Sequence, residues 1–178
     1  MNAAGEQLDG RLLFERQKGL RASQTFAIGP VIIAAGLQLA ENMGSVLRVA
    51  DAAGSQKVIF IGDAVAQIHL NRTARHTDIL VGWEFCPSED FIARGAEFQP
   101  LIALELTTES KSLFEAALPN LCTFVIGSER YGISDTILAL CQQAVHIPMY
   151  GFNGSMNVTH ALAIALFEWR RQHSPNNQ

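Results

Sequence analysis

Apolar and polar positions alternate in blocks along the chain, and the period of each block predicts its secondary structure. Short continuous apolar runs, typical of strands buried on both faces, predict strands at 31–35, 57–62, 101–104, 121–126 and 145–147, with another at 79–81. Apolar residues at helical spacing predict helices at 6–20, 42–53, 110–118, 134–141 and 155–171, and one that opens at 88. Strands alternating with helices predict an α/β fold, a mostly parallel sheet with helices on both faces.

Polar residues and glycines at the ends of these segments supply helix boundaries. The residues suited to an N-cap are Asn42, Ser88, Ser134 and Ser155. Gly54 suits the end of helix 42–53, because glycine readily adopts the left-handed conformation found after helices.

Length and composition indicate one globular domain, with 1–25 as a helical extension ahead of the first strand of a single domain over 1–178. The hydrophobic fraction is 48% and no apolar run approaches the ~20 residues that cross a bilayer. The first ten residues lack the basic and apolar segments of a secretory signal. Three isolated cysteines, Cys86, Cys122 and Cys141, lack metal-ligand spacing and suit packing roles as reduced thiols in a cytoplasm.

The net charge of −4 argues at first against a nucleic-acid partner, because proteins that neutralise phosphates tend to be basic. The positive residues are nevertheless grouped. One group lies near the N-terminus and a second comprises Arg72, Arg75 and His76. A local basic patch on an acidic protein is compatible with this distribution, although a solvated loop explains the second group equally well.

Ligands of parallel sheets bind beyond the carboxyl ends of the strands, which directs attention to three loops. The first, at 41–48, carries Asn42 and Arg48, whose plain interpretations are a helix cap and a solvated cation. The second, at 127–132, places Glu129 between two glycines directly after an apolar strand. It has neither the Lys-Ser/Thr of a P-loop nor the G-x-G-x-x-G of a dinucleotide site, and by itself is compatible with any tight loop.

The third loop, at 147–158, is rich in glycine and polar residues and leads into the last helix. Ser155 and Asn157 lie where the loop becomes helical, and Pro148 ends the preceding strand. Its plain interpretation is a long entry to the helix. The loop is too polar to be a buried connection.

In order and spacing, these three loops resemble the three signature motifs of the SpoU (TrmH-like) branch of the SPOUT methyltransferases. The resemblance rests on Asn42 and Arg48, on Gly127 and Glu129, and on Ile147-Pro148-Met149 followed by Ser155-Met156-Asn157-Val158. It covers about 31–168. Met156 stands where leucine is expected, Thr159 and His160 replace smaller residues, and Arg130-Tyr131 is bulky for its loop. These departures leave the shape of the substrate side open.

The resemblance implies a C-terminal deep trefoil knot whose loops hold S-adenosyl-L-methionine. The residues that it assigns to the cofactor are Leu104, Gly127, Ile147, Met149 and Met156. It also implies methyl transfer to an RNA ribose 2′-hydroxyl, with Arg48 as the activating residue and Asn42, Glu129, Ser155 and Asn157 around it. Because guanidinium groups have a pKa above ~12, orienting the substrate and stabilising negative charge is a more cautious role for Arg48 than general base. Under this interpretation Arg72, Arg75 and His76 contact RNA phosphates, and tRNA is preferred to rRNA as the substrate.

The last helix is apolar on two sides, which favours a homodimer. One face carries Leu162 and Trp169, and the other carries Ile164 and Phe167. Burial of both faces within one subunit is the alternative; the family resemblance agrees with a dimer. No metal is expected, because no ligand cluster is present. Two other functions stay open: an inactive knotted RNA-binding module and a nucleotide-dependent oxidoreductase.

Overall fold

The computed structural model describes residues 5, 7–23, 28–62, 81–98 and 100–173. Two compact units are distinguished: one contains 1–27 with the last three residues, and the other spans Ile28–Pro175. The first contains α1 (Gly10–Ser23). Asp9 caps this helix, since its Oδ1 accepts a hydrogen bond from the Leu12 N–H at 2.8 Å. The helix predicted at 6–20 is therefore present, shifted a few residues toward the C-terminus.

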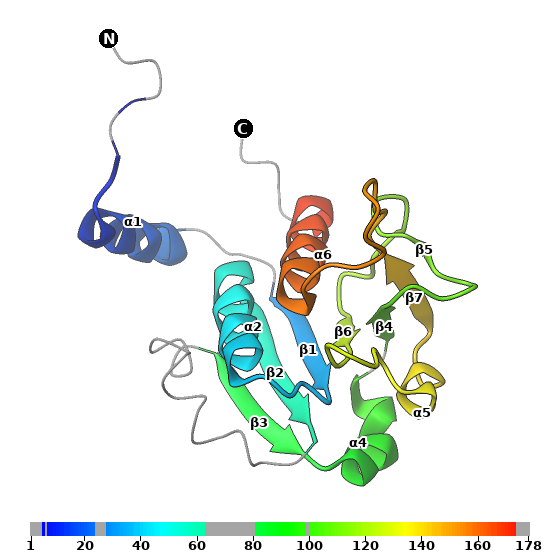
Figure 1. Cartoon of the computed structure of the whole chain (residues 1–178). Coiled ribbons are helices and arrows are strands. Elements are labelled where there is room, and N and C mark those ends of the chain that lie inside the picture. The colour runs from blue at the N-terminus through cyan, green and yellow to red at the C-terminus, as the bar shows by residue number, and fades with distance from the viewer. Residues whose placement is uncertain (1–4, 6, 24–27, 63–80, 99, 174–178) are drawn as a thin grey trace. The chain divides into compact units, whose positions relative to one another are not determined.

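The second unit is an α/β fold built on one parallel sheet (Figure 1). Its strands are β1 (Gly29–Ala35), β2 (Ser55–Ile61), β3 (Gly82–Cys86), β4 (Leu101–Leu104), β5 (Lys111–Ser112), β6 (Thr123–Ile126) and β7 (Gln143–His146). Its helices are α2 (Ala40–Ala53), α4 (Ser88–Arg94), α5 (Asp135–Leu138) and α6 (Val158–His173), with a short 3-10 helix, η3 (Gly95–Phe98). The strand order is β3-β2-β1-β6-β4-β7-β5, and each described pairing is parallel.

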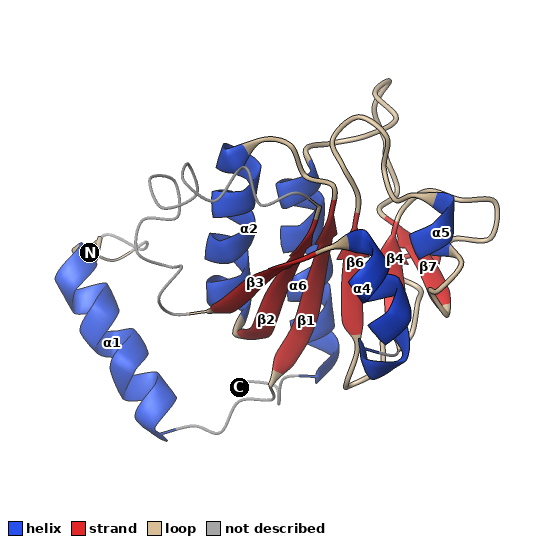
Figure 2. Cartoon of the chain, turned by 90° about the horizontal axis from the view of Figure 1, so that it is seen from below, coloured by secondary structure: helices blue, strands red, loops and turns tan. Residues whose placement is uncertain are grey.

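Helices cover both faces of this sheet, as the sequence predicts. Figure 2 shows α2 and α6 on one side and α4 on the other. Alternate strand residues such as Ile33 and Val125 are fully buried in a cluster with Phe91 of α4. Their neighbours along the strands, such as Ile32, point to the opposite face, where α2 and α6 pack on each other and on the sheet. This two-sided burial explains why the central strands are continuous apolar runs.

The two long helices of the sheet unit begin at other residues than the sequence predicts. Gly54 does terminate α2, with φ 63° and its N–H bonded to Ala50 and Asp51 carbonyls. However, α2 begins at Ala40, so Asn42 lies inside the first turn and is not the N-cap. At α6 the capping residue is Asn157 instead of Ser155, because Asn157 Oδ1 accepts the Thr159 N–H at 2.8 Å.

Three further predictions need correction. The stretch 110–118 contains the short strand β5 and turns, not a helix. Its first residue, Ser110, closes a turn with Thr107, and the chain then enters β5. Strand β3 was not predicted as such, and the run proposed at 79–81 lies almost wholly outside the described residues. Ser88 is the first residue of α4, after an N-cap at Pro87.

The cysteines are free thiols, and burial sets their chemistry. Cys86 and Cys122 are buried, and Cys141 is partly buried. Burial raises the pKa of Cys122 to about 12 and that of Cys141 to about 11, so both stay protonated at neutral pH. Among the described residues, no helix has the length and apolar character that a membrane crossing requires.

Candidate functional site

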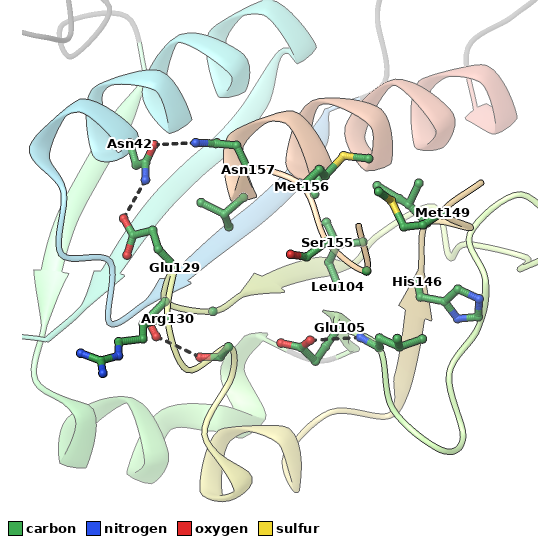
Figure 3. Close-up of a pocket in the computed structure, with 18 of the residues that line it drawn as sticks. Asn42, Leu104, Glu105, Glu129, Arg130, His146, Met149, Ser155, Met156 and Asn157 are labelled. Carbon is green, nitrogen blue, oxygen red and sulfur yellow. Dashed lines mark hydrogen bonds between the residues drawn. The ribbon is translucent and has the colours of Figure 1, made fainter. Parts of the chain in front are cut away.

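A cavity of about 830 Å³ opens at the carboxyl edge of the sheet, beyond the ends of β4, β6 and β7 (Figure 3). The loops that follow these strands supply most of its walls, and the start of α2 supplies the rest. The volume falls within the range usual for small-molecule sites. The sequence directs attention to this edge, since loops after parallel strands converge there.

Glu129 is the centre of a hydrogen-bond network on one wall of the cavity. Its Oε1 accepts a hydrogen bond from Asn42 Nδ2 at 2.7 Å and another from the Leu39 N–H at 3.3 Å. Its Oε2 accepts the Gln38 N–H at 3.2 Å. Burial alone raises the pKa of Glu129, but the hydrogen bonds from Asn42 and from backbone N–H groups outweigh it, so the pKa lies below its ordinary value. Glu129 is therefore a fixed carboxylate at neutral pH.

The same network continues from Asn42 to the start of α6. Asn42 Oδ1 accepts a hydrogen bond from Asn157 Nδ2 at 3.3 Å (Figure 3). Asn157 Oδ1 in turn accepts a hydrogen bond from the Thr159 hydroxyl. Asn42 and Thr159 are both buried polar residues whose partners lie within this chain of bonds. The network thus joins the three loops singled out from the sequence, through one residue of each.

The loop 127–132 is closed on itself, which gives its backbone a fixed shape. Ser128 and Gly132 form two reciprocal backbone hydrogen bonds of 3.0 Å each. A Cβ atom at Gly127 would collide with the backbone of Gly132 and Ile133. Gly132 itself has φ +66°, a conformation that favours glycine. Gly127 and Gly132 both line the cavity and, having no side chains, do so through their backbone.

Glu105 is a cavity residue that the sequence interpretation missed. It directly follows the predicted cofactor residue Leu104, and both line the cavity. Its Oε2 accepts the Ile133 N–H at 3.2 Å, and its Oε1 accepts the Leu106 N–H at 3.1 Å. Glu105 therefore fastens the end of the glycine loop to the end of β4. A carboxylate at the carboxyl end of a strand was the available signal.

His146, the last residue of β7, also lines the cavity. Its Nδ1 lies 2.9 Å from Ser110 Oγ, and Ser110 donates in turn to the Thr107 carbonyl. This arrangement holds the segment after β4 against the end of β7.

The five residues predicted to contact a cofactor all line the cavity, as does Ser155. They are Leu104, Gly127, Ile147, Met149 and Met156. Four of them carry apolar side chains, and the fifth is the glycine whose neighbours leave no room for a side chain. An apolar slot bordered by backbone groups and two carboxylates fits a nucleoside with a positively charged sulfur.

Arg48 is the predicted catalytic residue that does not lie in this cavity. It is exposed on α2 and lines a second hollow of about 350 Å³ with His160 and Phe167 of α6. Asn42 and Arg48 are six positions apart, which places them about 120° apart around a helix. Within one chain the described structure therefore separates Arg48 from the network of Glu129. The predicted RNA contacts Arg72, Arg75 and His76 lie outside the described residues.

The chain is similar to known proteins over most of its length. Residues 29–167 match the SpoU rRNA Methylase family. A tRNA (guanosine(18)-2′-O)-methyltransferase from Thermus thermophilus is 26% identical over 74% of this chain and 69% of its own length. A 23S rRNA (guanosine-2′-O-)-methyltransferase from Salmonella typhi is 30% identical over 81% of this chain and 60% of its own. The crystal structure of the SpoU methyltransferase AviRb from Streptomyces viridochromogenes in complex with AdoMet superimposes with a TM-score of 0.71 and 25% identity. It covers 86% of this chain and 61% of that one.

Proposed function

The chain belongs to the SpoU rRNA Methylase family of S-adenosylmethionine-dependent RNA methyltransferases, and on this premise we propose that it methylates a ribose 2′-hydroxyl of RNA. The family, the class of enzyme and the cofactor expected from the three motifs are thereby confirmed. The observation that carries the proposal is the network of Glu129, Asn42 and Asn157, which joins all three motifs at one cavity.

The residues around the cavity fit the cofactor. Bound S-adenosylmethionine supplies an activated methyl group on a cationic sulfur. Leu104, Met149 and Met156 offer an apolar surface for its adenine, and the Gly127 loop offers backbone groups. The carboxylates of Glu105 and Glu129 favour a positive charge in the cavity.

Asn42, Glu129 and Asn157 act on the RNA side as a rigid set of polar groups. Their mutual hydrogen bonds fix the side chains before substrate arrives, so little reorganisation is needed when the ribose enters. Ser155 also lines the cavity, where its hydroxyl is available to the substrate. In the transfer the ribose oxygen would bond to the methyl carbon as the carbon–sulfur bond breaks, with that electron pair going to sulfur and the hydroxyl proton passing to solvent. Polar groups near the oxygen would stabilise the negative charge that develops on it.

We assign Arg48 to the site of a second copy of the chain. It lies apart from the cavity of its own chain, in a hollow whose other wall is the half-exposed side of α6 with Phe167. A homodimer formed through this side of α6 covers that apolar surface and brings Arg48 toward the partner's cavity. There its guanidinium orients the ribose and adjoining phosphate and stabilises negative charge.

Three further parts of the proposal rest on the family and on charge. We infer a knotted C-terminal segment, in which the loops around the cavity are threaded together. We also infer that Arg72, Arg75 and His76 contact phosphates, and that tRNA is preferred to rRNA. The matched relatives include enzymes named for each of these RNAs. A cytoplasmic location, suited to three free thiols, also stays a prediction.

Methyl transfer from labelled S-adenosylmethionine to bulk bacterial tRNA and rRNA tests the proposal. Nucleoside mass spectrometry then identifies the modified position. The expected product carries a 2′-O-methylribose. RNA binding without any methyl transfer would instead indicate an inactive RNA-binding module, and a methyl group on a base would contradict the proposed acceptor.

A further inference from the structure

Two aromatic side chains stand out from the loop that borders the cavity between β7 and α6. The exposed fraction of Tyr150 is 93%, and that of Phe152 is 111%, so neither ring packs on the rest of the subunit. Their loop also lines the cavity through Met149 and Ser155. Large apolar rings left in water at the mouth of a site mark a binding surface.

The opposite loop carries an aromatic ring in the same situation. Tyr131 has an exposed fraction of 72%, and the guanidinium carbon of Arg130 lies 5.2 Å from the centre of its ring. Arg130 lines the cavity, and Figure 3 shows it on the wall away from Met149. Exposed rings thus occur on both loops that flank the cavity.

The charges around this cavity give little attraction for phosphates. Its described lining residues include two carboxylates, Glu105 and Glu129, against one permanent cation, Arg130. The whole chain has a net charge of −4. Within one chain, the described residues at this edge therefore offer few contacts that neutralise phosphates, and affinity for RNA here needs other contacts as well. Stacking on the faces of bases is the main alternative, because each base has a π-face whatever the sequence.

We propose that Tyr150 and Phe152 form a stacking platform for unpaired bases next to the methylated nucleotide. This inference rests on the proposed function, since it takes RNA as the substrate. Bases inside a duplex are covered on both faces by their neighbours, so the platform accepts only nucleotides in loops, bulges or single strands. The enzyme accordingly selects unpaired RNA through these rings.

A second copy of the chain is the competing occupant of this surface. The half-exposed side of α6 and the hollow with Arg48 and Phe167 are where we place the partner subunit. Tyr150 and Phe152 lie on a loop that precedes α6. Nothing lies within 4 Å of a Cβ built at Gly151, so the backbone between the two rings stands clear of the subunit.

Binding of labelled RNA to alanine variants tests the platform. The probes are a 12-nucleotide oligoadenylate and a 12-base-pair RNA duplex, followed by fluorescence anisotropy. Wild-type protein should prefer the single strand. Tyr150→Ala and Phe152→Ala should each weaken single-strand binding about tenfold, and the slope of log affinity against log salt should not change. Leu121→Ala, which removes a 72% exposed apolar side chain just before β6, is the matched control and should bind normally.

Aromatic replacements keep the test independent of folding. Tyr150→Trp and Phe152→Trp should retain affinity, and the fluorescence of each new tryptophan should be quenched by the bound oligonucleotide. Unchanged affinity in the double alanine variant would overturn the platform, as would equal wild-type affinity for the duplex. Monomers of the alanine variants in sedimentation would also overturn it, because the rings would then cover a second copy.

The platform and the proposed function fail in different ways. If wild-type protein transfers no methyl group but the alanine variants still lose single-strand affinity, the function is wrong and the platform stands. If methyl transfer is normal and the double alanine variant binds RNA as wild type does, only the platform is wrong.

Discussion

The side-chain amide of Asn42 donates a 2.7 Å hydrogen bond to Glu129, joining two residues that are 87 positions apart in the chain. This bond fastens the first turn of α2 to the loop after β6. It also keeps the carboxylate oriented toward the cavity, with its pKa below the ordinary value. Glu129 is thereby held as an anion at neutral pH.

Removing this bond should impair catalysis more than cofactor binding. Asn42→Ala removes a hydrogen bond to a charged group, worth about 1.5–3 kcal/mol, and breaks the link between Glu129 and Asn157, leaving Glu129 with its backbone donors only. We expect kcat for methyl transfer to fall at least about tenfold. Calorimetry should find nearly unchanged cofactor affinity, because Asn42 lies on the RNA side. A selective loss of cofactor affinity with normal kcat would contradict this division of roles.

Arg48→Ala should abolish methyl transfer without loss of cofactor affinity. The loss should be at least about 10²-fold, the usual effect of removing a group that stabilises developing charge. Normal turnover would remove the central assignment.

A mixing experiment tests whether the active site is shared between subunits. Arg48→Ala and Glu129→Gln homodimers should each be inactive. After subunit exchange, a mixed dimer contains one site with both residues intact, so activity should return to part of the wild-type value. Failure to recover activity, with exchange verified by mass spectrometry, would indicate that both residues serve within one chain.

Replacing Ile164 and Phe167 by glutamate should yield monomers in sedimentation, since both lie on the α6 side assigned to the dimer.

Gly127→Ala should destroy the cofactor site. The added methyl group would collide with the backbone of Gly132 and Ile133, which no side-chain movement relieves. We expect a free energy of unfolding lower by about 3 kcal/mol and no measurable cofactor binding. Gly151→Ala is the matched control, because nothing lies within 4 Å of its added carbon. Its unfolding free energy should stay within about 0.5 kcal/mol of wild type.

Glu168 should make stability depend on acid pH. It is buried on α6 and accepts hydrogen bonds from Arg171 at 2.7 Å and Gln172 at 2.8 Å. The bonds from Arg171 lower its pKa below 4.5, although burial opposes the shift. Its contribution to the free energy of unfolding is therefore complete above pH 4.5. This contribution is lost as the pH falls through the lower pKa that Glu168 has in the folded state. In urea titrations, the free energy of unfolding should fall less for Glu168→Gln than for wild type when the pH is lowered below 4.5.

The sequence predicts the parts of the fold that depend on local patterning. The buried strand 31–35 and the helix ending at Gly54 follow from apolar spacing and from a glycine in the left-handed conformation. Strand β3 does not, because Glu84 interrupts its apolar residues, and at this edge of the sheet only Cys86 of the strand is buried. The prediction of a helix at 110–118 is wrong. Leu113 and Ala116 are both buried and three positions apart, as on a helix, but turns bring their side chains into the core.

Contacts between residues far apart in the chain limit how much of the site can be predicted from the sequence. Motif spacing identifies Asn42, Glu129 and Asn157, but their bonds to one another depend on how distant strands are ordered in the sheet. The sequence could have predicted that Asn42 and Arg48 are separated, because side chains six positions apart on a helix point about 120° away from each other. Glu105 was missed because a single carboxylate after a strand has no motif of its own.

The bond between Asn157 and Asn42 spans 115 positions, and this has a consequence for synthesis. The wall that it completes cannot form until α6 has been synthesised, and α6 follows every described strand of the sheet in the chain. Parallel sheets whose neighbours are far apart in the chain also assemble slowly. A nascent chain therefore has no methyl-donor site to fill, and cofactor captured afterwards stabilises only molecules that have finished folding.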